Sequence, residues 1–265
     1  MPFLRMFAML MALQLVGCGV WRPTPVPMRT LSFAARCDAK ASTLLVFLPG
    51  SYSRPEDYLS HGFIDAVQGQ HVAADIVLVD AHLGYYSERS ILDRLRQDVL
   101  LPARADGYRD IWLVGISVGA YGALLHAATS EPGQPAVAGI VALAPYLGDR
   151  RVSLSVDAAG GLALWPLQRR LEPADFDVLL WQWLRGASRS QNPTRLYLGY
   201  GDSDRFAYSD RLLGAALPAD HVVTAPGGHD WPVWQILWRR ILPTLPLPRD
   251  SSCRFDAAIN PLHPL

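Results

Sequence analysis

The feature that most constrains this chain is a Gly-x-Ser-x-Gly pattern between an apolar run and a helix of small residues. Residues 111–114 are apolar, residues 115–119 read Gly-Ile-Ser-Val-Gly, and residues 120–125 are mostly small. A serine held on a strained turn leaves no room for a Cβ atom two residues before or after it. The small residues that follow let the helix lie close to the strand. This context is typical of a nucleophile elbow, so Ser117 is the candidate nucleophile.

Apolar runs rich in β-branched residues recur along the chain, with helical segments between them. Strands that are apolar almost throughout are buried on both faces, as in a parallel sheet covered by helices. The sequence therefore predicts a doubly wound α/β fold, with helices on both faces of a mostly parallel sheet. The predicted strands are 43–48, 75–79, 111–114, 139–143, 195–198 and 221–224, and helical periodicity is clearest in 87–101, 120–128, 209–216 and 232–241.

Length, composition and charge limit the classes of function. The chain has 265 residues, of which 50% are hydrophobic, enough for the core of one catalytic domain, which we place at 37–265. Basic and acidic residues number 24 each, so no net field favours nucleic acid or an acidic membrane surface. The histidines lack metal-ligand spacing, and no dinucleotide or phosphate loop is present. We expect no cofactor, no metal and no nucleic-acid partner.

The N-terminus has the composition of an export signal. Residues 1–17 carry one positive charge, at Arg5, followed by an apolar stretch too short to span a bilayer comfortably. The end of this segment, Leu-Val-Gly-Cys at 15–18, resembles the lipobox of bacterial lipoproteins, in which cleavage before the cysteine leaves a diacylated Cys18. An ordinary signal peptide or an uncleaved anchor is the alternative. Gly19 resembles lipoproteins of the outer membrane, which implies a lipid-anchored protein of the bacterial envelope that faces the periplasm.

Two further features concern the ends of the mature chain. Alternating prolines in 21–27 predict an extended spacer, and we assign 18–36 to a membrane tether. Export would place Cys37 and Cys253 in an oxidising compartment, so we predict that they pair, with two unrelated buried thiols as the alternative. A loop of this length constrains the unfolded chain by about 5 kcal/mol in the entropy model.

The alternation of strands and helices breaks in residues 147–192. This segment holds a small-residue stretch at 158–162 and then a predicted helix at 173–185 with two tryptophans. An insertion at this place in the strand order commonly covers a site. We interpret it as a small lid or cap, and a long crossover helix with its loop is the equally weighted alternative.

A candidate base and a candidate acid follow later strands. A serine hydroxyl is a poor nucleophile until a base takes its proton, and the base needs an acid to fix its tautomer. The run 195–198 leads into a turn with Asp202 and Asp204, and the run 221–224 leads into Gly-Gly-His at 227–229. The order serine, aspartate, histidine is the one expected after a nucleophile elbow of this kind.

These residues resemble the α/β-hydrolase superfamily across nearly the whole mature chain, from about residue 43 to 242. The family's acid commonly sits in a Gly-x-x-Asp turn, matched at 201–204, so the resemblance assigns the acid to Asp204, with Asp202 as the alternative. The turn at 227–229 looks like the glycine-glycine-histidine turn of esterase-type members, which assigns the base to His229. The resemblance also implies the α/β-hydrolase fold.

Two backbone N–H groups are expected to bind the oxyanion of a tetrahedral intermediate. One is that of Val118, directly after the candidate nucleophile. The other should come from the loop after the first predicted strand, residues 48–52, which looks like the family's histidine-glycine loop but carries Pro49 where histidine is common. We choose Ser51, with Tyr52 as the second choice.

Three residues are weaker candidates for a substrate pocket: Tyr52, Tyr146 and His82. Tyr146 ends a predicted strand on the same side as Ser117, and His82 follows a strand, where loops form the crevice of such folds. A structural histidine is at least as good an interpretation of His82. The resemblance implies a serine hydrolase that cleaves esters through an acyl-enzyme, and the apolar, tryptophan-containing insertion favours a small uncharged ester. Acyl transfer by the same triad, or a non-catalytic scaffold of this fold in the envelope, are the alternatives.

Overall fold

The computed structural model describes residues 22–37, 40–130, 136–168, 172, 175–187 and 194–255. The predicted signal segment and Cys18 lie outside the described residues, as do parts of the 147–192 insertion. Within the described residues, no helix combines the length and the apolar character that crossing a bilayer requires.

A seven-stranded sheet in the order β1-β4-β3-β5-β6-β7-β8 forms the centre of the molecule. Strands β3 to β8 pair in parallel, and β1 pairs antiparallel with β4 at one edge. Each predicted run overlaps a strand, although His221 lies in a 3-10 turn before β8, and the predicted mostly parallel sheet is confirmed. The strands are β1 (Thr30–Phe33), β3 (Thr43–Leu48), β4 (Ala74–Val79), β5 (Asp110–Ile116), β6 (Gly139–Leu143), β7 (Arg195–Gly201) and β8 (Val222–Ala225).

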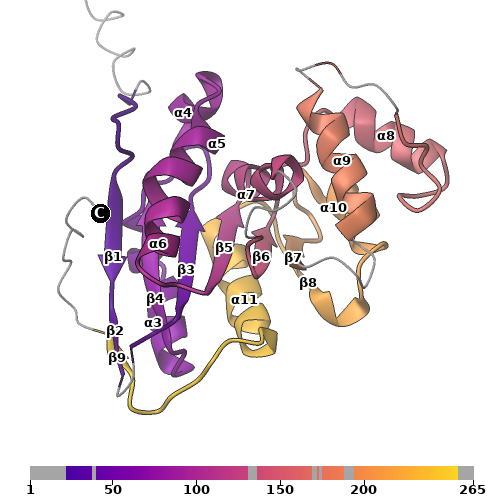
Figure 1. Ribbon diagram of the computed structural model, residues 1–265. Coiled ribbons are helices and arrows are strands. Elements are labelled where there is room, and N and C mark those ends of the chain that lie inside the picture. The colour runs from indigo at the N-terminus through magenta and orange to yellow at the C-terminus, as the bar shows by residue number, and fades with distance from the viewer. Residues whose placement is uncertain are drawn as a thin grey trace, which may run out of the picture.

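Helices cover both faces of the sheet, and each face has its own apolar core (Figure 1). Alternate residues of β5 show the division, because Leu113 belongs to one core and Trp112 to the other. Side chains of a strand point to opposite faces in turn, so a strand buried on both sides must be apolar throughout. One face is covered by α2 (Asp57–Ser60), α3 (Phe63–Gly69) and α11 (Trp231–Ile241), and the other by α4 (Leu83–Ser87), α5 (Ile91–Arg94), η1 (Leu95–Leu100), α6 (Leu101–Ala105), α7 (Val118–Thr129), α8 (Arg150–Ala158), α9 (Phe176–Ala187) and α10 (Ala207–Gly214).

The helical segment predicted at 87–101 is interrupted. It begins earlier, as α4, and Arg89 then takes a positive φ of 58° that separates α4 from α5. The chain next forms a π-helical turn, η1, before α6. Pro102 lies in the first turn of α6 and has no amide proton to donate to the carbonyl of Asp98, and its ring crowds that carbonyl. The backbone hydrogen bonds before the proline therefore shift to the wider spacing of a π-helix.

From Arg22 onward, the segment predicted as a free tether lies on the domain. The hydroxyl of Tyr85 donates to the carbonyl of Pro25 at 2.8 Å, and the amide of Met28 donates to Asp98 at 2.8 Å. Residues Thr30–Phe33 then form the edge strand β1. Proline lacks a donor but keeps its carbonyl, so a proline-containing segment still binds donors on a folded surface. The domain therefore begins well before residue 37.

The predicted pairing of Cys37 with Cys253 is present as a disulfide. The two cysteines lie beside a second, two-stranded sheet, in which β2 (Ala35–Arg36) pairs with β9 (Arg254–Phe255). The bridge thus joins the two ends of the described chain. The two cysteines are separated by 216 positions in the sequence, so the bridge closes a long loop.

The described part of the 147–192 insertion consists mainly of two helices, α8 and α9, packed on the rest of the domain. Helix α9 lies against α7 and buries Leu180, Trp181 and Leu184. The indole of Trp181 donates to the carbonyl of Leu147 at 2.9 Å. Tyr121, on α7, donates to Asp177 of α9 at 2.8 Å. Apolar packing and these hydrogen bonds hold α9 beside the helix that begins at Ser117.

Candidate active site

The candidate nucleophile lies on a sharp turn between β5 and α7. Ser117 has φ 56° and ψ −117°, a strained conformation for a residue with a side chain. A Cβ atom at Gly115 would lie 2.4 Å from the Cα of Ala120, and one at Gly119 would lie 2.1 Å from the carbonyl oxygen of Leu48. Glycine is therefore required at both positions, because the first turn of α7 leaves no room for a side chain at 115, and the end of β3 leaves none at 119.

The structure brings Ser117, His229 and Asp204 together in one hydrogen-bonded series. The Oγ of Ser117 lies 3.0 Å from Nε2 of His229, and Nδ1 of His229 lies 2.8 Å from Oδ2 of Asp204. Since the carboxylate accepts only, Nδ1 carries the proton and Nε2 is free to accept from the serine hydroxyl. The three residues come from the turns after β5, β7 and β8, at the carboxyl edge of the parallel strands.

The two aspartates of the acid turn have different partners. Asp204 is 6% exposed, and its second oxygen accepts the amide of Phe206 at 2.8 Å. Asp202 is exposed and accepts the hydroxyl of Ser203 at 2.9 Å and the amide of Gly227 at 3.2 Å. Hydrogen bonds from Ser203 and Gly227 lower the pKa of Asp202. Asp202 therefore ties the acid turn to the turn that carries the histidine, and Asp204 alone of the two contacts His229.

The two candidate oxyanion donors lie on backbone next to Ser117. Val118 opens α7, where the first N–H groups of a helix have no intrahelical acceptor. In the loop after β3, the amide of Ser53 donates to the carbonyl of Gly50 at 3.1 Å, which places Ser51 and Tyr52 at the corner of a tight turn. A Cβ atom at Gly50 would lie 3.6 Å from the Cβ of Ser117. Among the described hydrogen bonds, neither Val118 nor Ser51 gives its amide to a protein acceptor.

A buried tyrosine that the sequence reasoning missed supports this loop. Tyr58, on α2, is fully buried, and its hydroxyl donates to the carbonyl of Leu48 at 2.7 Å. Desolvation raises the pKa of Tyr58, so the hydroxyl keeps its proton and remains a donor. Tyr52, by contrast, has 83% of its surface exposed and projects from the loop.

Aromatic rings surround the histidine. The rings of Phe206 and Trp234 each lie 5.1 Å from the His229 ring, in edge-to-face contact. Tyr146 packs against Phe206 at 5.5 Å, and its amide donates to the carbonyl of Ser117 at 3.2 Å, so this pocket candidate does lie beside the serine. Phe206 and Trp234 were not predicted. Their only signal in the sequence is an aromatic residue shortly after Asp204 and after His229.

His82 has a structural environment. Only 3% of its surface is exposed, its Nδ1 accepts the amide of Gly84 at 3.1 Å, and its Nε2 lies 3.0 Å from the carbonyl of Pro23. Both ring nitrogens are thus engaged with backbone, where His82 caps α4 and holds the N-terminal segment. These contacts favour the structural interpretation of His82 over a position on the rim of the substrate pocket.

A further buried carboxyl lies near the candidate triad. Asp210, on α10, is fully buried, and neither of its side-chain oxygens has a hydrogen-bond partner among the described residues. Burial raises the pKa of Asp210 well above its usual range, the nearby charge of Asp204 adds to the shift, and Arg211 opposes it. No sequence pattern distinguished this aspartate from one on a solvated helix face.

One group of potential metal ligands occurs among the described residues, formed by Cys37, Asp250 and Cys253. Both cysteines are in the disulfide, so neither offers a thiolate to a metal.

The chain was compared with known proteins at the level of sequence and of structure. No family model matches the sequence, and no curated protein matches it either. Solved structures do match. An S-formylglutathione hydrolase of Staphylococcus aureus superposes with a TM-score of 0.51 at 16% identity, over 77% of this chain and 80% of that one. FphF, a fluorophosphonate-binding serine hydrolase of S. aureus, gives 0.52 at 15%, over 84% and 96%.

A third match, Est1E from Butyrivibrio proteoclasticus, has a TM-score of 0.53 at 15% identity, over 82% of this chain and 94% of that one. At sequence identities this low, the structural matches establish a shared fold and nothing further. Together with the seven-stranded, mostly parallel sheet and its two helical layers, they show that the protein has the α/β-hydrolase fold, as the sequence predicted.

Proposed function

We propose that the protein is a serine hydrolase that cleaves carboxylic esters through an acyl-enzyme intermediate. The observation that carries the proposal is the hydrogen-bonded series Ser117–His229–Asp204 at the carboxyl edge of the sheet. Structural neighbours that are serine hydrolases support it. The hydrogen-bonded series and the structural neighbours together support ester hydrolysis in general. The roles proposed for the individual residues are argued from the geometry alone.

In the proposed reaction, Ser117 attacks the ester carbonyl while Nε2 of His229 takes the hydroxyl proton. Asp204 keeps the other ring nitrogen protonated and stabilises the imidazolium that forms. The imidazolium then gives its proton to the leaving alcohol, and an acyl-enzyme remains on Ser117. Water, deprotonated by His229, attacks the acyl-enzyme and releases the acid, which restores the serine.

The negative charge that develops on the carbonyl oxygen needs fixed donors. The amides of Val118 and Ser51 are the proposed pair, and Tyr58 holds the loop that carries the second. Donors that are already oriented need no reorganisation during the reaction, and removal of one such donor in other hydrolases costs about 10²–10³ in kcat. Tyr52 remains the second choice for the loop donor.

The proposed substrate is a small uncharged ester. The half-buried rings of Tyr146 and Phe206 next to Ser117 and His229 offer apolar contact to an acyl or alcohol group. Apolar walls with few polar groups are typical of small-molecule sites. The helices of the 147–192 insertion lie beside α7, and we propose that this insertion serves as a cap over the site.

Reaction with a fluorophosphonate tests the proposal, because such reagents phosphonylate only an activated serine. Mass spectrometry with peptide mapping should find one adduct, on Ser117, and none in the Ser117→Ala variant. The same variant should lose turnover of a short p-nitrophenyl ester and keep its Tm. Wild-type turnover by Ser117→Ala would contradict the assignment of the serine, and an unlabelled but folded wild type would favour a binding scaffold. Product analysis with added alcohols separates hydrolysis from acyl transfer.

We also propose that the protein is anchored in a bacterial envelope through a diacylated Cys18. The Cys37–Cys253 disulfide agrees with an oxidising compartment outside the cytoplasm. Metabolic labelling with palmitate tests the anchor. The wild type should be labelled and found with membranes, and Cys18→Ser should be neither. Equal labelling of the two would rule out Cys18 as the acylated residue.

A further inference from the structure

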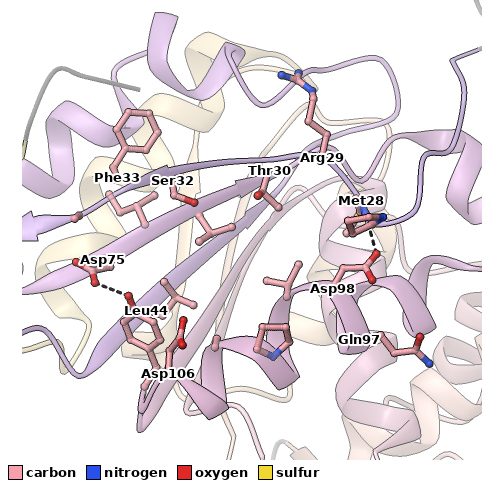
Figure 2. Close-up of a pocket in the computed structure, with 18 of the residues that line it drawn as sticks. Met28, Arg29, Thr30, Ser32, Phe33, Leu44, Asp75, Gln97, Asp98 and Asp106 are labelled. Carbon is pink, nitrogen blue, oxygen red and sulfur yellow. Dashed lines mark hydrogen bonds between the residues drawn. The ribbon is translucent and has the colours of Figure 1, made fainter. Parts of the chain in front are cut away.

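A cavity of about 800 Å³ lies between the edge strand β1 and the helical segment 95–105 (Figure 2). Its floor includes Leu44 of β3 and residues 75–77 of β4, and the lining residues Thr30 and Ser32 belong to the edge strand β1. Ser117 follows the carboxyl end of β5. The cavity therefore lies at the β1–β4 edge of the sheet, whereas Ser117 follows a central strand, and it includes none of the residues of the candidate active site.

The walls of this cavity are mostly apolar. Met28 and Val77 lie on the strand side, and Val99, Pro102 and Ala103 lie on the helical side. Small-molecule sites are typically cavities of about 300–1,000 Å³ with apolar walls and a few polar groups that set the orientation of the ligand. In size and in lining, this cavity has the properties of such a site.

A buried hydroxyl on the cavity wall has no partner in the protein. Ser32 is 7% exposed, and its Oγ makes no hydrogen bond within the described part of the chain. Its neighbours Leu31 and Phe33 pack into the core on the other face of the sheet, so Ser32 points to the cavity side. An unpaired buried hydroxyl is unfavourable, and a ligand with a hydrogen-bonding head group would satisfy it, as donor or as acceptor.

The charged groups of the wall are mainly carboxylates. Figure 2 shows Asp75 and Asp106 toward one end of the cavity and Asp98 toward the other. Asp98 is paired with Arg94 at 3.1 Å. Asp75 accepts the hydroxyl of Tyr108 and the amide of Ala35, and neither Asp75 nor Asp106 forms a salt bridge within the described residues.

The cations near the cavity have other partners. Arg29 lines it, but its guanidinium is directed away in Figure 2 and binds Glu56 and Asp80. Lys40 donates to the backbone carbonyl of Asp106 at 3.3 Å, and Arg104 donates to that of Tyr108 at 3.1 Å, but neither cation lines the cavity. The charged side chains that line the cavity at the Asp75 end are therefore the carboxylates of Asp75 and Asp106.

We propose that this cavity binds an amphiphilic cation, that is, a molecule with an aliphatic body and a protonated amine. The body lies along the apolar walls. The ammonium group lies at the end with Asp75 and Asp106 and donates to the hydroxyl of Ser32. A carboxylate head group of the same length would meet like charge at this end, so fatty-acid anions are disfavoured. The proposal is independent of the ester hydrolysis proposed above.

Isothermal titration calorimetry of the full chain with decylammonium chloride tests the proposal, with decanoate as the matched anion. Decylammonium should bind, and decanoate should bind at least about tenfold more weakly. Ser117→Ala should bind decylammonium as the wild type does, because the two sites are separate. Equal or tighter binding of decanoate overturns the proposal, as does the absence of decylammonium binding to folded protein.

Variants of the wall locate the ligand. Asp106→Asn removes an exposed carboxylate without a partner and should weaken decylammonium binding about threefold to tenfold. Asp93→Asn, an exposed aspartate on α5 that does not line the cavity, is the matched control and should change nothing. Equal affinities of the two variants overturn the assignment of the charged end.

Filling the cavity is the complementary test. Ala103→Trp should abolish binding, and if this variant does not fold, Ser32→Ala should still weaken binding about twofold to fivefold without loss of volume. Retention of full affinity by a folded Ala103→Trp, or by Ser32→Ala, overturns the proposal. Binding that occurs only after removal of residues 256–265 would assign the cavity to the chain's own end and also overturn it.

Discussion

Two regions that follow β7 each bury an aspartate, but they differ in the hydrogen-bond partners that they give to its carboxyl group. In the turn at 201–204, every oxygen of Asp204 has a partner, namely His229 and the amide of Phe206. In α10, six positions further along the chain, Asp210 is fully buried and has none among the described residues. A buried carboxylate is stable only when it is paired or hydrogen-bonded. The first aspartate is therefore held by its partners in the orientation that the proposed triad needs, whereas burial raises the pKa of the second.

Asp202 completes the comparison, because it is exposed and bound to neighbouring turns. Three aspartates within nine residues thus have three environments: a hydrogen-bonded carboxyl group beside the histidine, one at the surface that joins two turns, and one in the core without a partner among the described residues. If this division is correct, substitution of each aspartate should have its own signature.

The largest effect is expected for Asp204→Asn. An amide at this position can hold the histidine in the wrong tautomer and cannot stabilise the imidazolium, so kcat for a p-nitrophenyl ester should fall by about 10³–10⁴-fold. Steady-state kinetics measures this, with Tm as the control for folding. A decrease of less than tenfold would remove Asp204 from the proposed triad.

Asp210→Asn should change stability and not activity. The raised pKa of Asp210 means that the folded state keeps a proton that the unfolded state loses above the ordinary pKa of 3.8. Its contribution to stability is therefore fully present below that pH and is lost as pH rises toward the raised value. Asparagine does not titrate, so the variant should exceed the wild type in Tm by a few degrees at pH 8.

The pH dependence separates titration from other effects of Asp210→Asn. The groups that act on Asp210 are Asp204, Arg211 and Tyr200, and all three are unchanged in the variant. The gain in Tm should therefore shrink as pH falls toward 4, with kcat near that of the wild type at pH 7. A constant gain at all pH values, or a loss of kcat comparable to that of Asp204→Asn, would contradict a neutral, non-catalytic Asp210.

The smallest effect is expected for Asp202→Ala. The substitution removes the hydrogen bonds to Ser203 and Gly227, which join the acid turn to the histidine turn, but leaves the His229–Asp204 contact in place. We expect kcat/KM to fall by less than about tenfold. A loss as large as that of Asp204→Asn would mean that Asp202 and not Asp204 serves the histidine.

Local sequence sufficed for features whose cause is local. The apolar strands, the glycines that flank Ser117 and the position of His229 after a strand each depend on a few neighbouring residues. The glycine requirement can be read from the pattern, because any Cβ atom at 115 or 119 collides with backbone. The interrupted helix around Arg89 and Pro102 was less visible, since helical periodicity persists through it.

Features set by distant residues could not be predicted. Tyr58 reaches the carbonyl of Leu48 only because α2 packs on β3, and Phe206 meets His229 only because the turns after β7 and β8 are adjacent. The sequence left His82 as either a pocket residue or a structural residue. Its contact with the carbonyl of Pro23 depends on the position of the N-terminal segment in the fold. The same segment, predicted as a tether from its prolines, lies on the domain because donors elsewhere in the fold bind its carbonyls.

The sequence by itself determined the α/β-hydrolase fold, the strained serine and its glycines, because strand periodicity and steric exclusion act over a few residues. It also supplied a histidine and two candidate acids in the right order. Only the tertiary structure decided which aspartate meets the histidine and which aspartate is buried without a partner. The physical reason is that hydrogen bonding and desolvation depend on neighbours from other strands and helices, whose positions the pattern of one segment does not contain.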